Sequence, residues 1–209
     1  ISVLPPMTKL EVQINVGENT YLLKMPKFLR AVNDLGASVV SRARNILSEK
    51  DKVVTGALSD SLGFEILETS TGITLSFGGS VPYWDFVEQG VKGAASSEKA
   101  PDSEYQFGSG TGKKGALKPA IRKWITDRGI SNQSWRDKKG RFLSYDAMSQ
   151  RIARSVYLTG IKPTGYYALA FDQTEKQAER KLSTALTNDL QVFYDSNFGK
   201  EYTIIYNIG

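Results

Sequence analysis

The sequence predicts an α+β fold in which a small antiparallel sheet, formed by a hairpin and the terminal strands, packs against long N- and C-terminal helices. Apolar residues recur at helical spacing after Pro26 and again after Tyr166, in both cases over many turns. Between these stretches, two short runs alternate apolar and polar residues around a glycine-bearing turn, which predicts a β-hairpin. We expect a single domain over residues 1–209, with a flexible loop at about 91–116 and a basic helical insertion at about 117–160.

The first half of the chain predicts a strand, a long helix and the hairpin. Residues 8–16 alternate apolar and polar side chains, as a half-buried strand does. Pro26 suits the first turn of a helix because its missing N–H has no partner there, and this helix should end near residues 49–51. Its predicted apolar stripe comprises Phe28, Leu29, Val32, Leu35, Gly36, Val39, Val40, Ala43, Ile46 and Leu47. The hairpin is predicted from Leu62, Phe64 and Ile66, followed after a turn by Ile73, Leu75 and Phe77.

The second half predicts a series of helices joined by turns. Ser144 is suited to cap the N-terminus of one of them, and Gly199 to end the last. In chain order we expect a short amphipathic turn or helix at 81–90, an exposed loop at 91–115, helices at 117–128 and 145–158, a turn at 160–165, a long helix from 166 to about 197, and a last strand at 202–208.

The composition argues against an enzyme. The chain has neither cysteine nor histidine, so thiolate nucleophiles, zinc–thiolate sites, Ser-His-Asp triads and HExxH metal sites are all excluded. An enzyme would have to use carboxylates, lysine or tyrosine alone. The chain also lacks a run of about 18 apolar residues, so we expect no membrane partner.

Two segments that flank the hairpin carry a resemblance to a known family. Residues 55–61 read TGALSDS and lead into the hairpin, and residues 81–90 read VPYWDFVEQG and follow it. A long helix, a TGxLxxS segment, a hairpin and a YxxxVExG segment in this order resemble the head–tail joining and tail-completion proteins of long-tailed phages. Residues 162–167, KPTGYY, resemble the step into the C-terminal helix of that family. The resemblance covers roughly residues 26–195, and the chain departs from it in the length of the 90–163 insertion.

The resemblance implies a structural virion protein that forms a ring at the head–tail connector and joins the DNA-filled head to the tail. The implied partners are copies of the same chain, the neighbouring portal or adaptor and tail proteins, and genomic DNA through non-specific contact. The implied location is the virion, after assembly in the host cytoplasm. The family has no catalytic activity and no cofactor, so no catalytic, cofactor or metal residue is expected. We expect the 91–115 loop and the C-terminal strand to become ordered on contact with adjacent rings.

Residues 81–90 supply the candidate subunit-interface residues Tyr83, Trp84, Phe86 and Glu88. The aromatic side chains combine large apolar area with polar tips, which is typical of protein–protein anchors, although they could instead cover the core of the domain itself. Glu88 could pair with a basic residue of a neighbouring subunit. Asp85 and Glu88 are three residues apart and share a helix face, so a metal-dependent hydrolase site is a weaker alternative to a solvated face. Residues 108–114 resemble a phosphate-binding loop only superficially, because the GxxxxGK[ST] spacing is missing and Lys114 is followed by Gly115.

The basic excess is concentrated in one stretch. The whole chain carries +5, but residues 113–141 hold ten basic and two acidic side chains and so carry +8, which leaves −3 for the rest. The candidate residues that would face a partner or DNA are Lys113, Lys114, Lys118, Arg122, Lys123, Arg136, Lys138, Lys139 and Arg141. Three interpretations stay open: a solvated surface, a contact with an acidic neighbouring ring, which we favour, and a contact with DNA.

A basic nucleic-acid-binding protein that uses residues 113–141 is the alternative function. Trp124, Trp135 and Phe142 are interleaved with the charges, as in single-strand stacking platforms. We expect Trp124 to pack into the core, because it lies on the apolar stripe of its helix.

Overall fold

The computed structural model describes residues 10–52, 55–69, 72–110 and 115–199, which belong to two compact units. Unit 1 takes its residues from 1–41, 64–77 and 170–209, and unit 2 from 42–63 and 78–169. The helices in these described ranges are each too short or too polar to cross a membrane.

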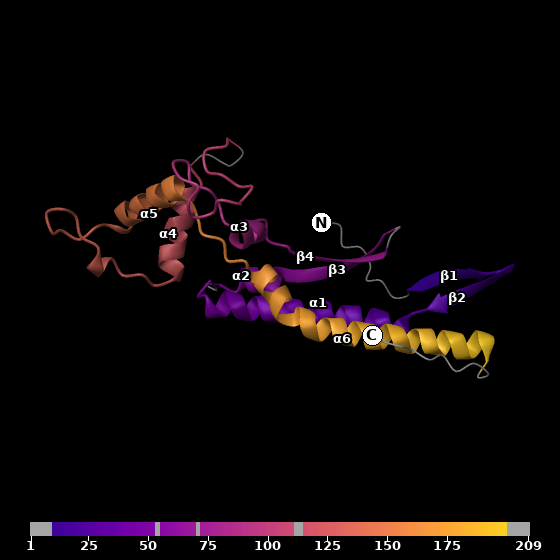
Figure 1. The fold of residues 1–209 in the computed structure, drawn as a ribbon. Helices are drawn as coiled ribbons and strands as arrows, with labels where there is room; N and C mark the ends of the chain where they lie inside the picture. The colour runs from indigo at the N-terminus through magenta and orange to yellow at the C-terminus, as the bar shows by residue number, and fades with distance from the viewer. Residues whose placement is uncertain (1–9, 53–54, 70–71, 111–114, 200–209) are drawn as a thin grey trace. The chain divides into compact units, whose positions relative to one another are not determined.

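The elements confirm a mixed α+β fold with long helices near both ends of the chain (Figure 1). The strands are β1 (Glu11–Val16), β2 (Asn19–Lys24), β3 (Leu62–Thr69) and β4 (Gly72–Gly79). The α-helices are α1 (Pro26–Glu49), α2 (Ala57–Ser61), α3 (Trp84–Gln89), α4 (Leu117–Asp127), α5 (Tyr145–Thr159) and α6 (Tyr166–Phe198), and a 3-10 turn, η1, spans Asn132–Ser134.

The strands form two separate two-stranded antiparallel sheets, where the sequence predicted one sheet with terminal strands. The difference arises at Gly17, whose φ of 62° lies in the left-handed region and reverses the chain. As a result β1 pairs with β2, from Glu11 opposite Lys24 to Val16 opposite Asn19. β2 was not predicted, because its apolar run lacks a clear alternation. The predicted strand at 202–208 lies outside the described residues.

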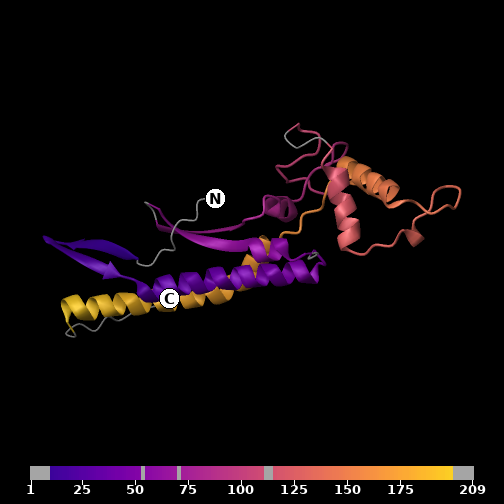
Figure 2. The ribbon, with the colours of Figure 1, turned by 180° about the vertical axis from the view of Figure 1, so that it is seen from behind.

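The two long helices, α1 and α6, pack together in unit 1, where they run side by side in both views (Figures 1 and 2). The Asp189 side chain of α6 is only 3% exposed, and its Oδ2 accepts a hydrogen bond from the backbone N–H of Phe28 at 2.8 Å. Phe28 is in the first turn of α1, where backbone N–H groups have no partner within the helix. Asp189 therefore fixes α6 to the start of α1.

A shared apolar cluster holds both sheets against these helices in unit 1. Its buried centre is formed by Leu10, Leu23, Met25 and Leu29, from the N-terminal hairpin and the start of α1. Residues from the second sheet and from α6 pack around this centre: Ile66, Ile73, Leu186 and Phe193. The predicted apolar face of α1 is therefore the face that the fold buries, whereas on the first strand Leu10 is buried and Ile14 packs against the cluster, but Val12 is 41% exposed.

Gly36 allows the second sheet to approach α1 closely. It is buried within the helix, and a Cβ atom at this position would overlap the ring of Phe64 on β3. Glycine inside a helix is otherwise unfavourable by about 1 kcal/mol relative to alanine. Its presence is explained by the space that the Phe64 ring needs.

Unit 2 contains a small helical subdomain with its own core. α4 and α5 pack against one another (Figure 1), around buried Ile125, Leu143 and Met148. The predicted cap is confirmed, because the Ser144 hydroxyl oxygen accepts a hydrogen bond from the Ala147 N–H at 3.2 Å. This subdomain corresponds to most of the predicted basic helical insertion.

Residues 91–110 contain no regular helix or strand, yet they are fixed to the rest of unit 2. Val91 forms an isolated antiparallel bridge with Ile161, with N···O distances of 2.9 and 2.8 Å. Gly93 packs directly against the backbone at the end of α5, and the buried Ser103 hydroxyl donates to the Gly90 carbonyl at 2.8 Å. The described part of this segment is mostly exposed, as its composition predicted, and its small residues allow the backbone to pack closely at these points of attachment.

We expect Gly36→Ala to lower the free energy of unfolding by about 1–3 kcal/mol, because the new methyl group overpacks the contact with Phe64. Urea denaturation measures this change. The exposed Ser38→Ala change on the same helix serves as the control, and it should stay within about 0.5 kcal/mol of the wild type. Phe64→Leu in the Gly36→Ala background should restore part of the loss, and the absence of any restoration would contradict the proposed close contact.

We expect Asp189→Ala to lower the free energy of unfolding by about 1.5–3 kcal/mol, because it leaves the Phe28 N–H without its charged acceptor. The matched control is Asp195→Ala on the exposed side of α6, which should change stability by less than about 0.5 kcal/mol. Equal losses in the two variants, measured by thermal denaturation, would show that Asp189 has no special role.

Candidate functional site

The two segments that carry the family resemblance meet in unit 2. Residues 55–59 of the TGALS segment, together with Tyr83 and Val87 of the second segment, line a shallow hollow of about 190 Å³. Gly56 has a φ of 80°, in the left-handed region, and turns the chain into α2. The hollow is smaller than typical small-molecule sites, which occupy about 300–1,000 Å³. It is therefore better suited to a single side chain than to a substrate.

Glu88 caps the N-terminus of α6. Its Oε2 accepts the Tyr167 N–H at 3.1 Å, and its Oε1 accepts the Ala168 N–H at 3.2 Å. A carboxylate in this position satisfies two unpaired N–H groups and interacts favourably with the helix dipole. The backbone strengthens the junction, since Thr164 and Gly165 donate to the carbonyls of Val87 and Glu88. Glu88 was predicted as an interface residue, but the structure engages both of its carboxylate oxygens within the chain.

Two adjacent tyrosines at the start of α6 form hydrogen bonds with α3 and with the second sheet. The Tyr166 side chain is fully buried, and its hydroxyl donates to the Trp84 carbonyl at 3.0 Å. The Tyr167 hydroxyl lies 2.7 Å from the Gly78 carbonyl and 3.0 Å from the Gly63 carbonyl, at the base of the second sheet. Burial raises the pKa of both phenols, that of Tyr167 to about 12. Both remain protonated donors and are not poised for acid–base chemistry near neutral pH.

The structure divides the predicted interface aromatics into two groups. Trp84 is half-buried and meets the Tyr167 ring edge-on, with 6.3 Å between ring centroids. Tyr83 and Phe86 are each 42% exposed, and Phe86 contacts the Tyr105 ring at 4.5 Å. Trp84 therefore belongs to the packing of the domain, while Tyr83 and Phe86 remain available to a partner.

The carboxylates of Asp85 and Glu88 bind different partners within the chain. Asp85 accepts hydrogen bonds from the Tyr105 hydroxyl and from the Gln89 side chain, whereas Glu88 caps α6. The bond to Asp85 raises the pKa of the Tyr105 phenol. Within the described part of the chain, no group of three or more acidic side chains is arranged to hold a metal ion.

Most of the basic residues near α4 are neutralised by nearby carboxylates. Lys118 pairs with Asp146 of α5 at 2.9 Å, and Lys123 pairs with Asp127 at 2.7 Å. Arg128 pairs with Asp51, at the end of α1, with a closest N···O distance of 2.6 Å. Arg122 lies 5.2 Å from the centroid of the Tyr145 ring. Lys113 and Lys114 lie outside the described residues.

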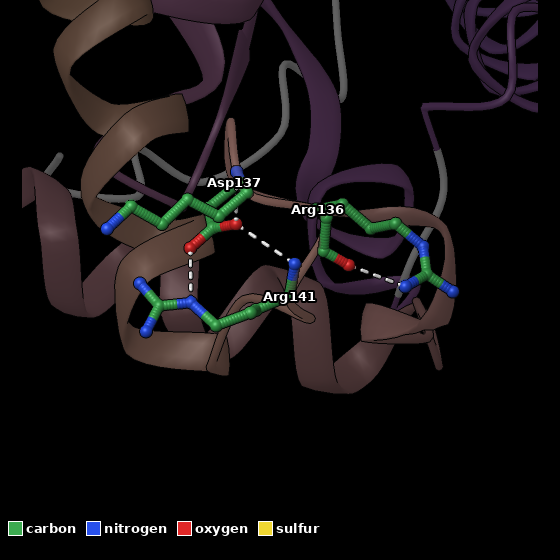
Figure 3. A network of polar contacts seen from close by, with 5 residues as sticks. Arg136, Asp137 and Arg141 are labelled. Atoms are coloured by element: carbon green, nitrogen blue, oxygen red, sulfur yellow. Dashed lines mark hydrogen bonds and ion pairs between the residues drawn. The ribbon is translucent and has the colours of Figure 1, made fainter.

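The remaining basic residues form a short hairpin, residues 136–142, which we call the basic hairpin. Arg136 and Phe142 form an antiparallel bridge, and the chain reverses at Gly140, where φ is 78°. Asp137 accepts hydrogen bonds from the Lys139 N–H at 2.8 Å and from the Arg141 N–H at 2.9 Å, and its other oxygen lies 2.8 Å from Arg141 Nε (Figure 3). These bonds lower the pKa of Asp137, so its carboxylate stays ionised and holds the turn together.

The aromatic residues of the basic stretch also separate. Trp135 packs on the core of the helical subdomain. Trp124 is 39% exposed, and the core position is taken by its neighbour Ile125, so the prediction that Trp124 is a core residue was wrong. Phe142 is 55% exposed and lies under the Arg136 guanidinium, 3.9 Å from its centre. Phe142 is thus the aromatic residue most closely associated with unneutralised charge.

Sequence reasoning missed two of the residues that organise these sites. The sequence predicts Asp51 only as a residue near the end of a helix. In the structure it adopts a left-handed φ of 52° and pairs with Arg128. Asp137 was counted only as one of two acids in a basic stretch. Its signal was available, because an aspartate three residues before a glycine is typical of a tight turn.

We expect Glu88→Ala to lower the free energy of unfolding of the isolated subunit by about 1–2 kcal/mol, through loss of the cap on α6. Glu88→Gln keeps one acceptor oxygen and should lose about half as much. Thermal denaturation at low protein concentration measures both effects. A loss that appears only at concentrations where the chain associates would instead assign Glu88 to a subunit interface.

Comparison with models of protein families, with curated proteins and with solved structures finds no match to this chain.

Proposed function

We propose that this chain is a structural virion protein of a tailed phage, which assembles into a closed ring at the head–tail junction and joins the DNA-filled head to the tail. On this proposal, the protein acts by binding copies of itself and neighbouring portal, adaptor or tail proteins. No catalytic step and no cofactor is involved. Virion location follows from the same proposal.

The observation that carries the proposal is the open second sheet. β3 and β4 each have eight residues, and within the described residues no third strand pairs with either of them. Two strands alone make a marginally stable sheet, and the edge of such a sheet is in general a place where a further strand can add. Strand addition from another copy extends such a sheet, and a repeated head-to-tail contact of this kind closes into a ring.

Exposed apolar side chains on other elements support the proposal. Tyr83 and Phe86 are exposed around α3, and Leu190 and Val192 are exposed near the end of α6, at 41% and 55%. Large apolar and aromatic side chains of this kind are typical of anchors in protein interfaces. The phage assignment itself depends on the TGALS and YWDFVEQG segments, which adjoin one hollow as parts of a shared motif would.

We expect the purified chain to form rings, seen as a concentration-dependent increase in sedimentation coefficient and as annular particles in negative-stain electron microscopy. Thr74→Pro and Leu75→Pro test the role of the β4 edge. Adjacent residues of a strand alternate between the paired side and the free edge, so one of these two variants removes an N–H that the hairpin uses and the other removes an N–H at the free edge.

The edge variant should melt like the wild type but remain monomeric, whereas the other variant should lose stability. A wild-type chain that is monomeric at every concentration would contradict ring formation. Rings that form normally in both proline variants would contradict strand addition along β4.

A further inference from the structure

The basic hairpin holds four of the eight basic side chains that lie in the described part of residues 113–141. Residues 136–142 contain four basic side chains and one acid, which gives +3 over seven residues. Lys118, Lys123 and Arg128 each lie within 3 Å of a carboxylate, at 2.9, 2.7 and 2.6 Å, and within the hairpin Arg141 pairs with Asp137 at 2.8 Å. The other three basic side chains of the hairpin, Arg136, Lys138 and Lys139, have no carboxylate within ion-pair distance among the described residues, and they give this turn a local positive field.

The basic hairpin is organised before any partner binds. Asp137 holds the backbone N–H groups of Lys139 and Arg141, and the Asp137 N–H donates to the Arg141 carbonyl at 2.9 Å. The oxygens of the single acid, Asp137, face donors of the turn itself, namely two backbone N–H groups and Arg141 Nε. An ordered turn loses less conformational entropy on binding than a disordered basic tail.

The hairpin presents cations on both faces and at its tip. The Arg136 and Arg141 side chains leave the turn in opposite directions (Figure 3), which agrees with their positions next to Phe142 and Asp137. Arg136 Nη1 donates to the Gly140 carbonyl at 2.6 Å and so remains extended along the exposed Phe142 ring. Lys138 and Lys139 occupy the exposed tip.

We propose that the basic hairpin is a nucleic-acid binding site, which contacts the phosphate backbone through Lys138, Lys139 and Arg141 and uses Phe142 with Arg136 as a stacking surface for unpaired bases. Phosphate contact needs only positioned cations and releases counterions, so a small site suffices. A stable contact with an acidic protein generally needs an interface of about 1,000 Å² or more, which a seven-residue turn does not supply by itself. A two-stranded ribbon also fits the DNA major groove.

The test measures binding of the full chain to a fluorescein-labelled DNA duplex by anisotropy, at about 50 to 200 mM salt. The Lys138→Ala/Lys139→Ala variant should weaken binding about tenfold per lysine near 0.1 M salt and reduce the salt slope by about two, since each phosphate contact contributes about 0.9. The matched control is Lys118→Ala/Lys123→Ala, which removes the same charge from lysines that are already ion-paired. It should bind within about twofold of the wild type.

A second arm uses single-stranded oligothymidine. Phe142→Ala should weaken binding to the single strand about tenfold and leave duplex binding nearly unchanged, because only unpaired bases can stack on the ring. Circular dichroism should show wild-type folding for every variant, since the changed side chains are exposed or, for Lys118, only partly buried.

Equal losses in the tip variant and in the control would overturn the proposal, and so would no measurable duplex binding at 50 mM salt. Tighter binding to polyglutamate than to DNA would also overturn it and would identify an acidic protein as the partner. None of these outcomes alters ring formation, so the failure of this inference is distinct from failure of the proposed function.

Discussion

The N-terminus of each long helix of this protein is capped by a carboxylate from a distant part of the chain. Glu88 caps α6 from the segment that follows the second sheet, and Asp189 caps α1 from near the end of α6. Helix N-termini need such acceptors, because their first N–H groups lack partners within the helix. Neither helix has a local Ser, Thr, Asp or Asn at the residue before its start, where Met25 and Gly165 stand. The N-terminal N–H groups of each helix therefore find their acceptor only when the tertiary fold around the helix start has formed. Helix formation is thus coupled to packing within each unit.

Carboxylate partners also determine where the positive charge of the protein remains exposed to solvent. A lysine or arginine contributes to an external field only where no carboxylate neutralises it, and Asp51, Asp127 and Asp146 neutralise three of the basic side chains associated with α4. Two of these acids lie outside the basic stretch as the sequence defines it. In the basic hairpin, the only acid acts on the backbone of the turn and leaves Lys138 and Lys139 without opposing charge. The ion pairs thus reduce the excess around α4 and leave two lysines unopposed at the tip of the basic hairpin.

Helix positions were predictable because their signal is local. The stripe from Phe28 to Leu47 repeats at helical spacing and needs no knowledge of the rest of the fold, and the same holds for Ser144 as a cap. Contacts between distant residues were not predictable, since nothing in the vicinity of Glu88 or Asp189 indicates which N–H group each will meet. Trp124 and Ile125 illustrate a related difficulty. Both lie at the edge of one apolar stripe, and only the position of α5 determines that Ile125 is buried and Trp124 is exposed.

The candidate assembly surfaces and the basic hairpin would respond differently to solution conditions, because they depend on different forces. Strand addition and apolar contacts vary little with salt, whereas phosphate contacts weaken steeply as counterions compete. A single hairpin with four cations binds a polyanion weakly. In the proposed ring, the same hairpin would be repeated once per subunit, and a nucleic acid held by one copy would meet the others at high effective concentration. The proposed assembly and the proposed nucleic-acid binding would then reinforce one another, because many weak contacts together hold a strand that each single contact can still release.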